Sequence, residues 1–284
     1  MTTISKAVLI TGCSTGIGRA TALRLAKAGH TVYASARKAA AIQDLAASGC
    51  KTLELDVCDE ASIRAAVAKV EGEQGAVGAL INNAGYGSEG PIEEVPMSEV
   101  RRQFETNVFG LVTLTKLVLP GMRRQGWGKI VNLSSMGGRM TLPGGGFYHA
   151  TKYAVEAISD ALRFEVQGFG IDVVIIEPGP IRTEFGETAI ARVAALGGDG
   201  SPYTEFLTVL QRQIRDAYDG PMGRLAADAD AVAKVIETAI TASRPRTRYV
   251  ITLAAHVMMG LRRWIGDRGW DAVMRTQFPT PKQA

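Results

Sequence analysis

Thr11-Gly12-Cys13-Ser14-Thr15-Gly16-Ile17-Gly18 follows a short apolar run, Ala7-Val8-Leu9-Ile10, and leads into a pattern typical of a helix. Glycines at such a strand-to-helix turn allow a tight bend, and they let backbone N–H groups and the helix N-terminus approach a pyrophosphate. A glycine loop alone is a weak signal, but its place after the first strand favours a dinucleotide site. We predict cofactor contacts at Gly12, Ser14, Thr15, Gly16, Ile17 and Gly18.

Cys13, inside this loop, has two interpretations. A thiolate near a helix N-terminus is stabilised, which would suit a redox role. A small residue that fits a tight turn is the simpler interpretation, and we favour it.

Short apolar, β-branched runs alternate with longer helical stretches along the first two thirds of the chain. This alternation is the βαβ pattern of a parallel sheet. It predicts an α/β fold with helices on both faces of the sheet. The predicted strands are residues 7–10, 31–34, 52–55, 79–81, 129–133 and 173–176, with a last strand at 248–252.

The alternation breaks after Ile176, and we expect residues 184–223 to form a lid over the substrate. A helix at about 228–243 and the last strand resume the pattern, and residues 254–284 form a helical tail. Apolar residues three and four apart in the tail, including Trp264 and Trp270, predict an amphipathic helix. We favour packing of this helix on its own domain or on another subunit. Insertion at a membrane surface, aided by Arg262 and Arg263, is the alternative.

Length and composition are those of one globular domain spanning residues 1–284. The chain has 46% hydrophobic and 21% charged residues and a net charge of +4. Its basic pairs are scattered, whereas a nucleic-acid site would need them clustered, so we expect no nucleic-acid partner. Three cysteines without CxxC spacing, and no signal peptide or transmembrane run, favour the cytoplasm.

The end of the second predicted strand, Ala34-Ser35-Ala36-Arg37-Lys38, bears on the choice of cofactor. Dinucleotide sites place an acidic residue there when the ribose 2′-hydroxyl is free, and a cation when it is phosphorylated. Arg37 offers a guanidinium that can hold a phosphate with two hydrogen bonds. We therefore expect NADP(H) in preference to NAD(H), although an ordinary basic pair at a helix entrance is the alternative.

Ser135, Tyr148 and Lys152 suggest hydride transfer on a carbonyl. A spacing of four places Tyr148 and Lys152 on one helix face. A tyrosine phenol has a pKa of about 10, so acid–base work near neutrality needs a positive charge beside it, which Lys152 supplies. The Ser135 hydroxyl can hold the substrate oxygen. Ser134 is an alternative for that role.

Taken together, these motifs resemble the short-chain dehydrogenase/reductase family, in its compact single-domain branch, over about residues 1–185. Six features in the correct order carry the resemblance: Thr11-Gly12-x-x-x-Gly16-x-Gly18, Asp56-Val57, Asn82-Asn83-Ala84-Gly85, Asn107, Ser135 with Tyr148 and Lys152, and Pro178-Gly179-Pro180-Ile181-Arg182-Thr183. The family interval of thirteen residues between serine and tyrosine selects Ser135. Thr15 departs from several NADP-dependent members, which carry a basic residue there.

The resemblance implies a doubly wound, seven-stranded Rossmann sheet of order 3-2-1-4-5-6-7. It implies that Tyr148 is the general acid/base, that Lys152 also holds the nicotinamide ribose, and that Asn107 links Lys152 to solvent through water. The remaining residues of the motifs would contact the cofactor, and these are Asp56, Val57, Asn82, Asn83, Ala84, Gly85, Pro178, Gly179, Ile181 and Thr183. Family members often pair through the helix that bears the tyrosine, and small residues at Ala150, Ala154, Ala157 and Ala161 suit a homodimer or homotetramer.

The predicted substrate pocket is mostly bulky and apolar, with Arg139 and Arg182 as the nearest cations. We therefore expect a hydrophobic ketone, aldehyde or alcohol. Residues 244–249 and the basic helix that follows also resemble the branch with 17β-hydroxysteroid and retinol dehydrogenases. The pocket residues we expect are Tyr86, Met136, Met140, Leu142, Phe147, Phe185, Tyr203, Phe206, Leu207 and Met222.

The leading hypothesis is an NADP(H)-dependent carbonyl reductase or alcohol dehydrogenase. Two alternatives remain open: a regulator or scaffold that binds NADP(H) as a ligand, and an epimerase or dehydratase that uses the nicotinamide transiently. His30, His149 and His256 are isolated, so we expect no metal.

Overall fold

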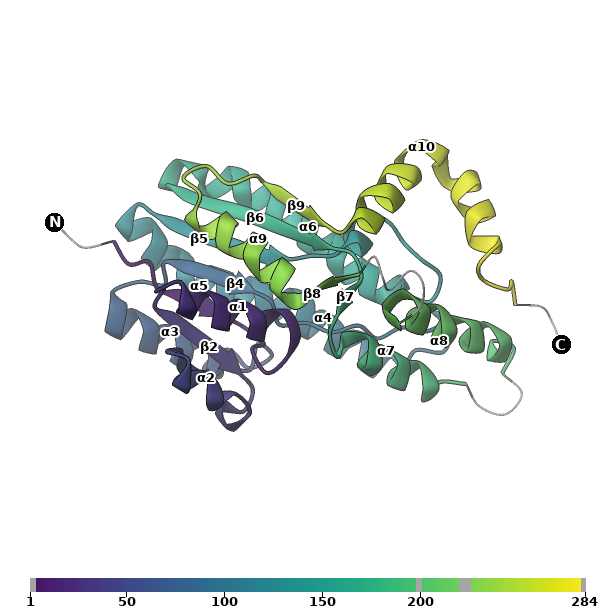
Figure 1. Ribbon diagram of the computed structural model, residues 1–284, viewed down its shortest axis with the longest axis horizontal. Coiled ribbons are helices and arrows are strands. Elements are labelled where there is room, and N and C mark those ends of the chain that lie inside the picture. The colour runs from purple at the N-terminus through teal and green to yellow at the C-terminus, as the bar shows by residue number, and fades with distance from the viewer. Residues whose placement is uncertain (1–3, 198–200, 220–225, 282–284) are drawn as a thin grey trace.

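The computed structural model describes residues 4–197, 201–219 and 226–281. A parallel sheet of seven strands forms its centre, in the order β3-β2-β1-β4-β5-β6-β9, and helices cover both faces (Figure 1). This confirms the predicted three-layer α/β/α, doubly wound Rossmann arrangement in a single domain. The strands are β1 Val8–Ile10, β2 Val32–Ala36, β3 Lys51–Glu54, β4 Ala79–Asn82, β5 Gly128–Leu133, β6 Ile171–Pro178 and β9 Arg248–Ile251, with β7 Ile181–Arg182 and β8 Ala227–Asp228 as a separate pair.

Helices connect the strands and lie on the sheet through apolar stripes. They are α1 Gly16–Lys27, α2 Asp44–Ala47, α3 Glu60–Gln74, α4 Met97–Phe104, α5 Gly110–Gln125, α6 Gly146–Val166, α7 Phe185–Ala194, α8 Thr204–Asp219, α9 Ala229–Thr241 and α10 Leu253–Arg275. Short 3₁₀ turns occupy Ala39–Ile42, Met136–Gly138 and Gln167–Phe169, and a π-helical turn at Glu105–Phe109 separates α4 from α5.

Alternate residues of each strand face opposite layers, as the pleat of a strand requires. In β1, Val8 and Ile10 join the core under α1 and α9, whereas Leu9 joins the core under α3 and α5. Both faces are buried, which explains why the strands are continuous apolar runs.

The first helix and the ninth pack side by side on one face of the sheet (Figure 1). Arg24 of α1 donates to Asp230 and to Glu237 at 2.8 Å each, across 206 and 213 residues of chain. On the other face, Arg248 of β9 donates to Glu156 and Asp160 of α6 at 3.0 and 2.7 Å. The last strand and helix of the domain are therefore tied to earlier elements by ion pairs as well as by packing.

Helices α7, α8 and α10, which we call the cap, gather beyond the carboxyl ends of the strands (Figure 1). They share a third apolar cluster that includes Phe206, Leu210 and Trp270. The cap contains the described part of the lid predicted at residues 184–223, of which residues 198–200 and 220–223 lie outside the described residues. The lid region is mainly two helices with apolar residues at helical spacing.

The tail forms α10, which bends at Gly266 (φ 63°). Met258, Met259, Ile265 and Trp270 pack into the cap, so this part of the tail packs on its own domain. Trp264 is 86% exposed. No helix within the described ranges is long and apolar enough to cross a membrane.

Candidate active site at the carboxyl edge of the sheet

The glycine loop between β1 and α1 has the conformation that its glycines permit. Gly12 and Gly16 have φ of 72° and 55°, in the region that disfavours other residues. A methyl group on Gly18 would lie 2.3 Å from the Gly12 carbonyl oxygen, so no larger residue fits there. No side chain of the described residues caps the first turn of α1, and its backbone N–H groups are available to an anion.

The segment after β4 is fastened to this loop by hydrogen bonds. The Asn83 amide donates to the carbonyl oxygens of Thr11 and Gly12 at 2.8 and 3.0 Å. The Thr11 hydroxyl accepts from the backbone N–H groups of Asn83 and Ala84 at 3.0 and 2.9 Å. Strands β1 and β4 are neighbours in the sheet, at the point where the strand order reverses. Ligands of such sheets bind in the crevice at this point.

Asn82 is turned away from that crevice. Its amide donates to Asn132 at 2.9 Å and to Thr115 at 3.1 Å, and its side chain is buried. Any cofactor contact by Asn82 would come from its backbone, because its side chain ties β4 to β5 and α5.

Asn107 lies in the π-helical turn and is 2% exposed. Its amide donates to the Tyr86 carbonyl at 2.9 Å and to Thr151 at 3.1 Å, and its oxygen accepts from the Tyr86 N–H at 3.0 Å. A methyl group on Gly85 would lie 3.1 Å from the Asn107 oxygen and 3.8 Å from the Lys152 nitrogen. Asn107 therefore joins the loop after β4 to α6, next to Lys152.

Ser135 and Tyr148 face each other from the end of β5 and the start of α6. The Ser135 oxygen accepts from the Gly137 N–H at 3.0 Å. Burial raises the pKa of Tyr148 above its usual value near 10, and a hydrogen bond with Ser135 acts in the opposite direction. The Phe185 ring packs on Tyr148, with the ring centroids 5.5 Å apart.

Lys152 lies one turn along α6, with its nitrogen 5.8 Å from the centroid of the Tyr148 ring. It donates to the Leu133 carbonyl at 2.8 Å. Burial lowers the pKa of Lys152 to about 8, and the negative charge of Glu156 opposes that shift. At neutral pH the side chain is therefore mostly charged and lies beside the phenol.

Ser134 points elsewhere. Its oxygen is buried and has no hydrogen-bond partner in the described part of the chain. A methyl group on Gly138 would lie 2.6 Å from it. The structure thus brings Ser135, and not Ser134, to Tyr148.

Arg37 and Asp56 follow the ends of the neighbouring strands β2 and β3. Arg37 is exposed and has no hydrogen bond or ion pair to another described residue. Asp56 accepts from the Cys58 N–H at 2.9 Å, and the buried Val57 follows it. These positions suit the adenosine half of a dinucleotide.

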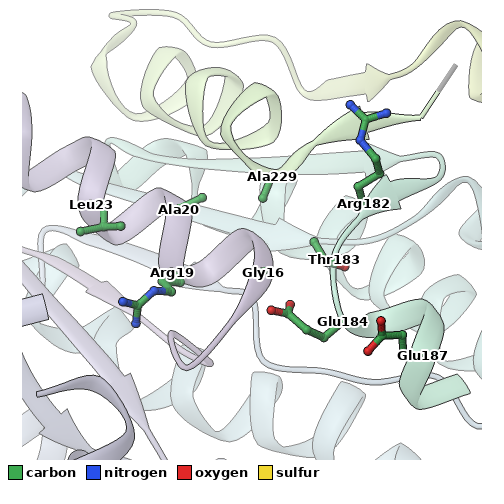
Figure 2. A pocket seen from close by; sticks show the side chains of 9 residues that line it. All are labelled: Gly16, Arg19, Ala20, Leu23, Arg182, Thr183, Glu184, Glu187 and Ala229. Atoms are coloured by element: carbon green, nitrogen blue, oxygen red, sulfur yellow. The ribbon is translucent and has the colours of Figure 1, made fainter. Parts of the chain in front are cut away.

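The segment after β6 faces the glycine loop across an open cleft of about 460 Å³ (Figure 2). A methyl group on Gly16 would lie 3.2 Å from the Thr183 methyl carbon. Before that segment, Pro178 pairs with Ile251 of β9, and the Gly179 N–H donates to the Ile251 carbonyl at 2.9 Å. Ile181 is buried in β7. The cleft is lined by Gly16, Arg19, Ala20, Leu23, Arg182, Thr183, Glu184, Glu187 and Ala229.

Sequence reasoning missed Arg19, Glu184 and Glu187, which line this cleft. Arg19 forms an ion pair with Asp44 of α2. Its position three residues after Gly16, on the first turn of α1, was a signal that could have placed it near the cofactor loop. Glu184 and Glu187 follow Thr183 directly at the start of α7.

The redox interpretation of Cys13 is wrong. Its sulfur is fully buried and donates to the Ile10 carbonyl at 3.4 Å. Burial raises the pKa of the thiol to about 12, so a thiolate does not form near neutral pH. Cys13 is a small packing residue of the loop.

His149 is a buried, neutral side chain. Its Nδ1 accepts from the Leu142 N–H at 3.1 Å, and burial lowers its pKa to about 4. Within residues 4–197, 201–219 and 226–281, no cluster of three His, Cys, Asp or Glu residues could hold a metal ion.

The predicted pocket residues fall into two groups. Phe185 packs on Tyr148, and Met136, Met140, Leu142, Tyr203, Phe206 and Leu207 belong to the apolar cluster of the cap. The Tyr86 ring instead lies 4.2 Å from the Arg192 guanidinium, between α4 and α7. Phe147 is half-buried, and Met222 lies outside the described residues.

The model of the short chain dehydrogenase family matches residues 6–193. The chain is a member of that family. A relative in Escherichia coli strain K12, the uncharacterized oxidoreductase YbbO, is 34% identical over 96% of this chain and 95% of that protein. The 3-ketodihydrosphingosine reductase of Bacteroides thetaiotaomicron is 41% identical over 74% and 77%. The NADPH-dependent 3-dehydrocapnine reductase of Ornithobacterium rhinotracheale is 36% identical over 93% and 94%.

Solved structures of dehydrogenases are similar to this chain in fold and in sequence. A short-chain dehydrogenase from Streptomyces avermitilis has a TM-score of 0.78 and 32% identity, covering 97% of this chain and 99% of that one. The closed form of serine dehydrogenase with NADP⁺ has a TM-score of 0.75 and 26% identity, covering 87% and 95%. This short-chain dehydrogenase/reductase is therefore an NAD(P)-dependent oxidoreductase that acts on CH–OH and carbonyl groups.

Proposed function

We propose that this enzyme interconverts a carbonyl and an alcohol on a hydrophobic substrate, with NADP(H) as its cofactor and Tyr148 as the general acid/base. The observation that carries the proposal is the convergence of Ser135, Tyr148 and Lys152 at the carboxyl edge of the sheet. Interaction with Ser135 lowers the pKa of the Tyr148 phenol against the effect of burial, and the Lys152 nitrogen is 5.8 Å from the centre of that ring. The apolar ring of Phe185 closes one side of the group.

The residues fit a dinucleotide. Methyl groups at Gly12, Gly16 and Gly85 would lie only 3.0 to 3.2 Å from neighbouring atoms. Glycine at these positions therefore avoids close contacts and leaves the backbone accessible to a ligand. Together with the uncapped first turn of α1, the glycines form a cradle for a pyrophosphate. When bound, the cofactor supplies or accepts the hydride at the substrate carbon.

Three side chains would carry the proton chemistry. In the reduction direction, Ser135 holds the carbonyl oxygen and Tyr148 delivers its phenolic proton to it, while the carbonyl carbon gains the hydride. The charge of Lys152 stabilises the phenolate that remains. In oxidation the phenolate takes the alcohol proton back.

Reprotonation through Asn107 and water stays a prediction. The Asn107 side chain already makes three hydrogen bonds, to Tyr86 and Thr151. A water on this route would therefore be held by the backbone of the π-helical turn, where the regular helix ladder is interrupted. Asn107 itself positions the loop at Gly85 beside Lys152.

The preference for NADP(H) rests on Arg37, a guanidinium at the end of β2 with no partner among the described residues. Thr15 adds nothing to it, because several NADP-dependent family members carry a basic residue at that position, so Arg37 must carry most of the selectivity. The name of the 3-dehydrocapnine reductase, which is NADPH-dependent, supports it. Two relatives are named as reductases, one of them of a 3-keto compound, which supports a carbonyl substrate. The similarity to 17β-hydroxysteroid and retinol dehydrogenases stays a hypothesis, because the relatives reported above carry other names.

The decisive assay offers a panel of hydrophobic ketones, aldehydes and alcohols with NADPH/NADP⁺ and NADH/NAD⁺ side by side. Arg37→Ala should raise the KM for NADPH about 10-fold or more and leave the KM for NADH unchanged, since a hydrogen bond to a charged group contributes about 1.5–3 kcal/mol. Equal kcat/KM with the two cofactors in the native enzyme would remove the argument from Arg37.

Tyr148→Phe tests the chemistry. We expect kcat to fall by about 100-fold or more, because a positioned proton donor contributes about 10²–10⁴ in rate, while the Kd for NADPH changes little. Tyr153→Phe, an exposed tyrosine on the same helix, is the matched control and should keep full activity. An active Tyr148→Phe enzyme would overturn the mechanism.

We also expect a homodimer or homotetramer and a cytoplasmic location. Ala150, Ala157 and Ala161 lie exposed along α6, where another helix could approach closely.

A further inference from the structure

The loop after β4 crosses directly over the proposed catalytic tyrosine. A methyl group on Gly87 would lie 2.9 Å from the Phe185 ring and 3.8 Å from the Tyr148 ring. Three residues later, the Gly90 N–H donates to the Gly144 carbonyl, just before α6, at 2.7 Å. Residues 87–90 therefore run from Phe185 to the loop before α6. Glu89 is the charged residue in this crossing.

The Glu89 carboxylate has no counterion among the residues that the structure describes. It makes no hydrogen bond or ion pair with any residue that the structure describes. Its neighbours Ser88 and Gly90 are buried, and its own side chain is half-buried. Burial raises the pKa of Glu89 to about 7.

The charge of Glu89 acts on two tyrosines. Burial is the main cause of the raised pKa of Tyr148, and the negative charge of Glu89 raises it further. The same two effects, together with Tyr148 itself, raise the pKa of Tyr218 on α8. Tyr218 packs over Gly186, next to Phe185, because a methyl group there would lie 2.7 Å from its ring. Glu89 thus lies two residues after Gly87, in the crossing that passes beside Phe185 and Tyr148.

Among the described residues, four cations on the elements around the proposed active site already have partners. Arg139 donates to Glu177 at 3.2 Å, and Arg182 donates to the Ala226 carbonyl at 2.8 Å. Arg192 pairs with Glu99. Lys152 donates to Leu133 and interacts with Glu156. An unpaired carboxylate inside a protein is costly, and a cation brought by a ligand would offset that cost.

We propose that Glu89 binds an ammonium group that the substrate carries close to its reacting carbon, so that the substrate is an amino ketone or the corresponding amino alcohol. This inference rests on the proposed function and narrows its substrate class. With the ammonium at Glu89 and the carbonyl at Ser135 and Tyr148, an apolar chain would extend past Phe185 toward the cap cluster. That cluster includes Leu142 and Met136, the residue that follows Ser135 in the chain.

An ammonium group at Glu89 would also assist the proton transfer. The negative charge of Glu89 opposes loss of the proton from Tyr148, since like charges disfavour each other. A bound cation cancels that charge. An amino substrate therefore eases phenolate formation, which a plain substrate of the same length cannot do.

The test compares 1-aminooctan-2-ol with octan-2-ol, oxidised with NADP⁺ and with NAD⁺ at pH 8. At this pH a carboxyl of pKa about 7 is mostly ionised and an aliphatic ammonium of pKa about 10 stays charged. We expect the native enzyme to favour the amino alcohol by about 10-fold or more in kcat/KM. Glu89→Gln should lower kcat/KM for the amino alcohol by a similar factor. It should leave octan-2-ol unchanged or faster.

Glu205→Gln, which removes the same charge from an exposed position on α8, is the control and should change neither value. Equal effects of Glu89→Gln on both alcohols, or a native enzyme that prefers octan-2-ol, would overturn the role of Glu89. Such a result would leave the proposed oxidoreductase function intact, because octan-2-ol turnover reports on that function separately.

A binding measurement covers the case in which neither alcohol is oxidised. Calorimetric titration of 1-aminooctan-2-ol into the enzyme with NADPH should give a Kd that rises about 10-fold in Glu89→Gln. The Kd of octan-2-ol should stay constant. Identical Kd values for the amino alcohol in the native enzyme and the variant contradict the proposal whatever the turnover.

Discussion

The carboxyl edge of the sheet and the cap hold their side chains in different ways. At the sheet edge, Thr11, Asn83, Asn107 and Lys152 each have a defined hydrogen-bond partner on another element. In the cap, Phe206, Leu210, Trp270 and their neighbours are held mainly by apolar contact. Directional bonds fix positions closely, whereas apolar contacts tolerate exchange of side chains of similar volume. The sheet edge can therefore keep the catalytic residues in place, while substitutions in the cap can change which substrates bind.

The largest expected effect is on cofactor binding, from adding a methyl group to the tightly packed glycine loop at the sheet edge. In Gly18→Ala, the new methyl group would lie 2.3 Å from the Gly12 carbonyl oxygen and 2.4 Å from the Asn83 amide nitrogen, so the loop must move. We expect the Kd for NADPH, measured by fluorescence titration, to rise about 100-fold, equivalent to a cost of about 3 kcal/mol.

Gly72→Ala is the matched control. A methyl group on Gly72, within α3, would have no heavy atom within 4 Å. This substitution should leave cofactor binding unchanged and stabilise the helix by about 0.5–1 kcal/mol. If Gly18→Ala bound NADPH like the native enzyme, the sheet edge would be as tolerant as the cap.

A pair of leucines tests whether the cap is a separate packing unit. Leu210→Ala removes a buried side chain from α8, and Leu114→Ala removes one from α5 beneath the sheet. Each deletion costs about 2–5 kcal/mol where the side chain packs. We expect Leu114→Ala to lower the midpoint of global unfolding by denaturant. Leu210→Ala should instead raise hydrogen exchange in α7, α8 and α10 and raise the substrate KM.

The Kd for NADPH is the readout that separates the two cases. In Leu210→Ala it should remain at the native value, because the glycine loop and Asn83 do not belong to the cap cluster. A loss of cofactor affinity equal to the loss of substrate affinity would show that the two regions are one unit.

The smallest expected effect is on the pH dependence of the free energy of unfolding, and it comes from the buried side chain of Lys152. Its pKa is lowered to about 8 in the folded protein from about 10.5, so between these values the unfolded chain binds more protons. The free energy of unfolding should therefore rise with pH across this window. Relative to Lys152→Met, the native protein without cofactor should gain about 2 kcal/mol between pH 8 and pH 10. Urea titrations at several pH values measure this, and parallel curves for the two proteins would contradict it.

Much of the sheet edge could be predicted from the sequence because its signals are local. The spacing of Gly12, Gly16 and Gly18 after an apolar run specifies a strand, a turn and a helix. The four-residue spacing of Tyr148 and Lys152 specifies one helix face. The orientation of a single side chain depended on distant partners. The Asn82 side chain turns toward Asn132 and Thr115, and the Tyr86 ring lies against Arg192. None of these three partners can be inferred from local spacing.

The cap was only partly predicted. Phe206, Leu207, Leu210 and Ile214 follow a helical period, so the sequence already contained the signal for α8. Glu89 was missed for another reason: we expected a charged residue of the pocket to be an arginine or a lysine. Its lack of a partner within the described part of the chain is a property of the folded structure, and no spacing in the sequence marks it.

The ion pairs between Arg24 and the ninth helix join residues separated by 206 and 213 positions. During synthesis, α1 leaves the ribosome long before its covering helix. The open edge of β6 likewise waits for β9, at Arg248–Ile251. A nascent chain can therefore contain every residue of the proposed catalytic set while one layer of the domain still lacks α9, and long-range closure of this kind is slow. NADPH affinity should consequently appear late in translation, after α9 has emerged, and not when the glycine loop is made.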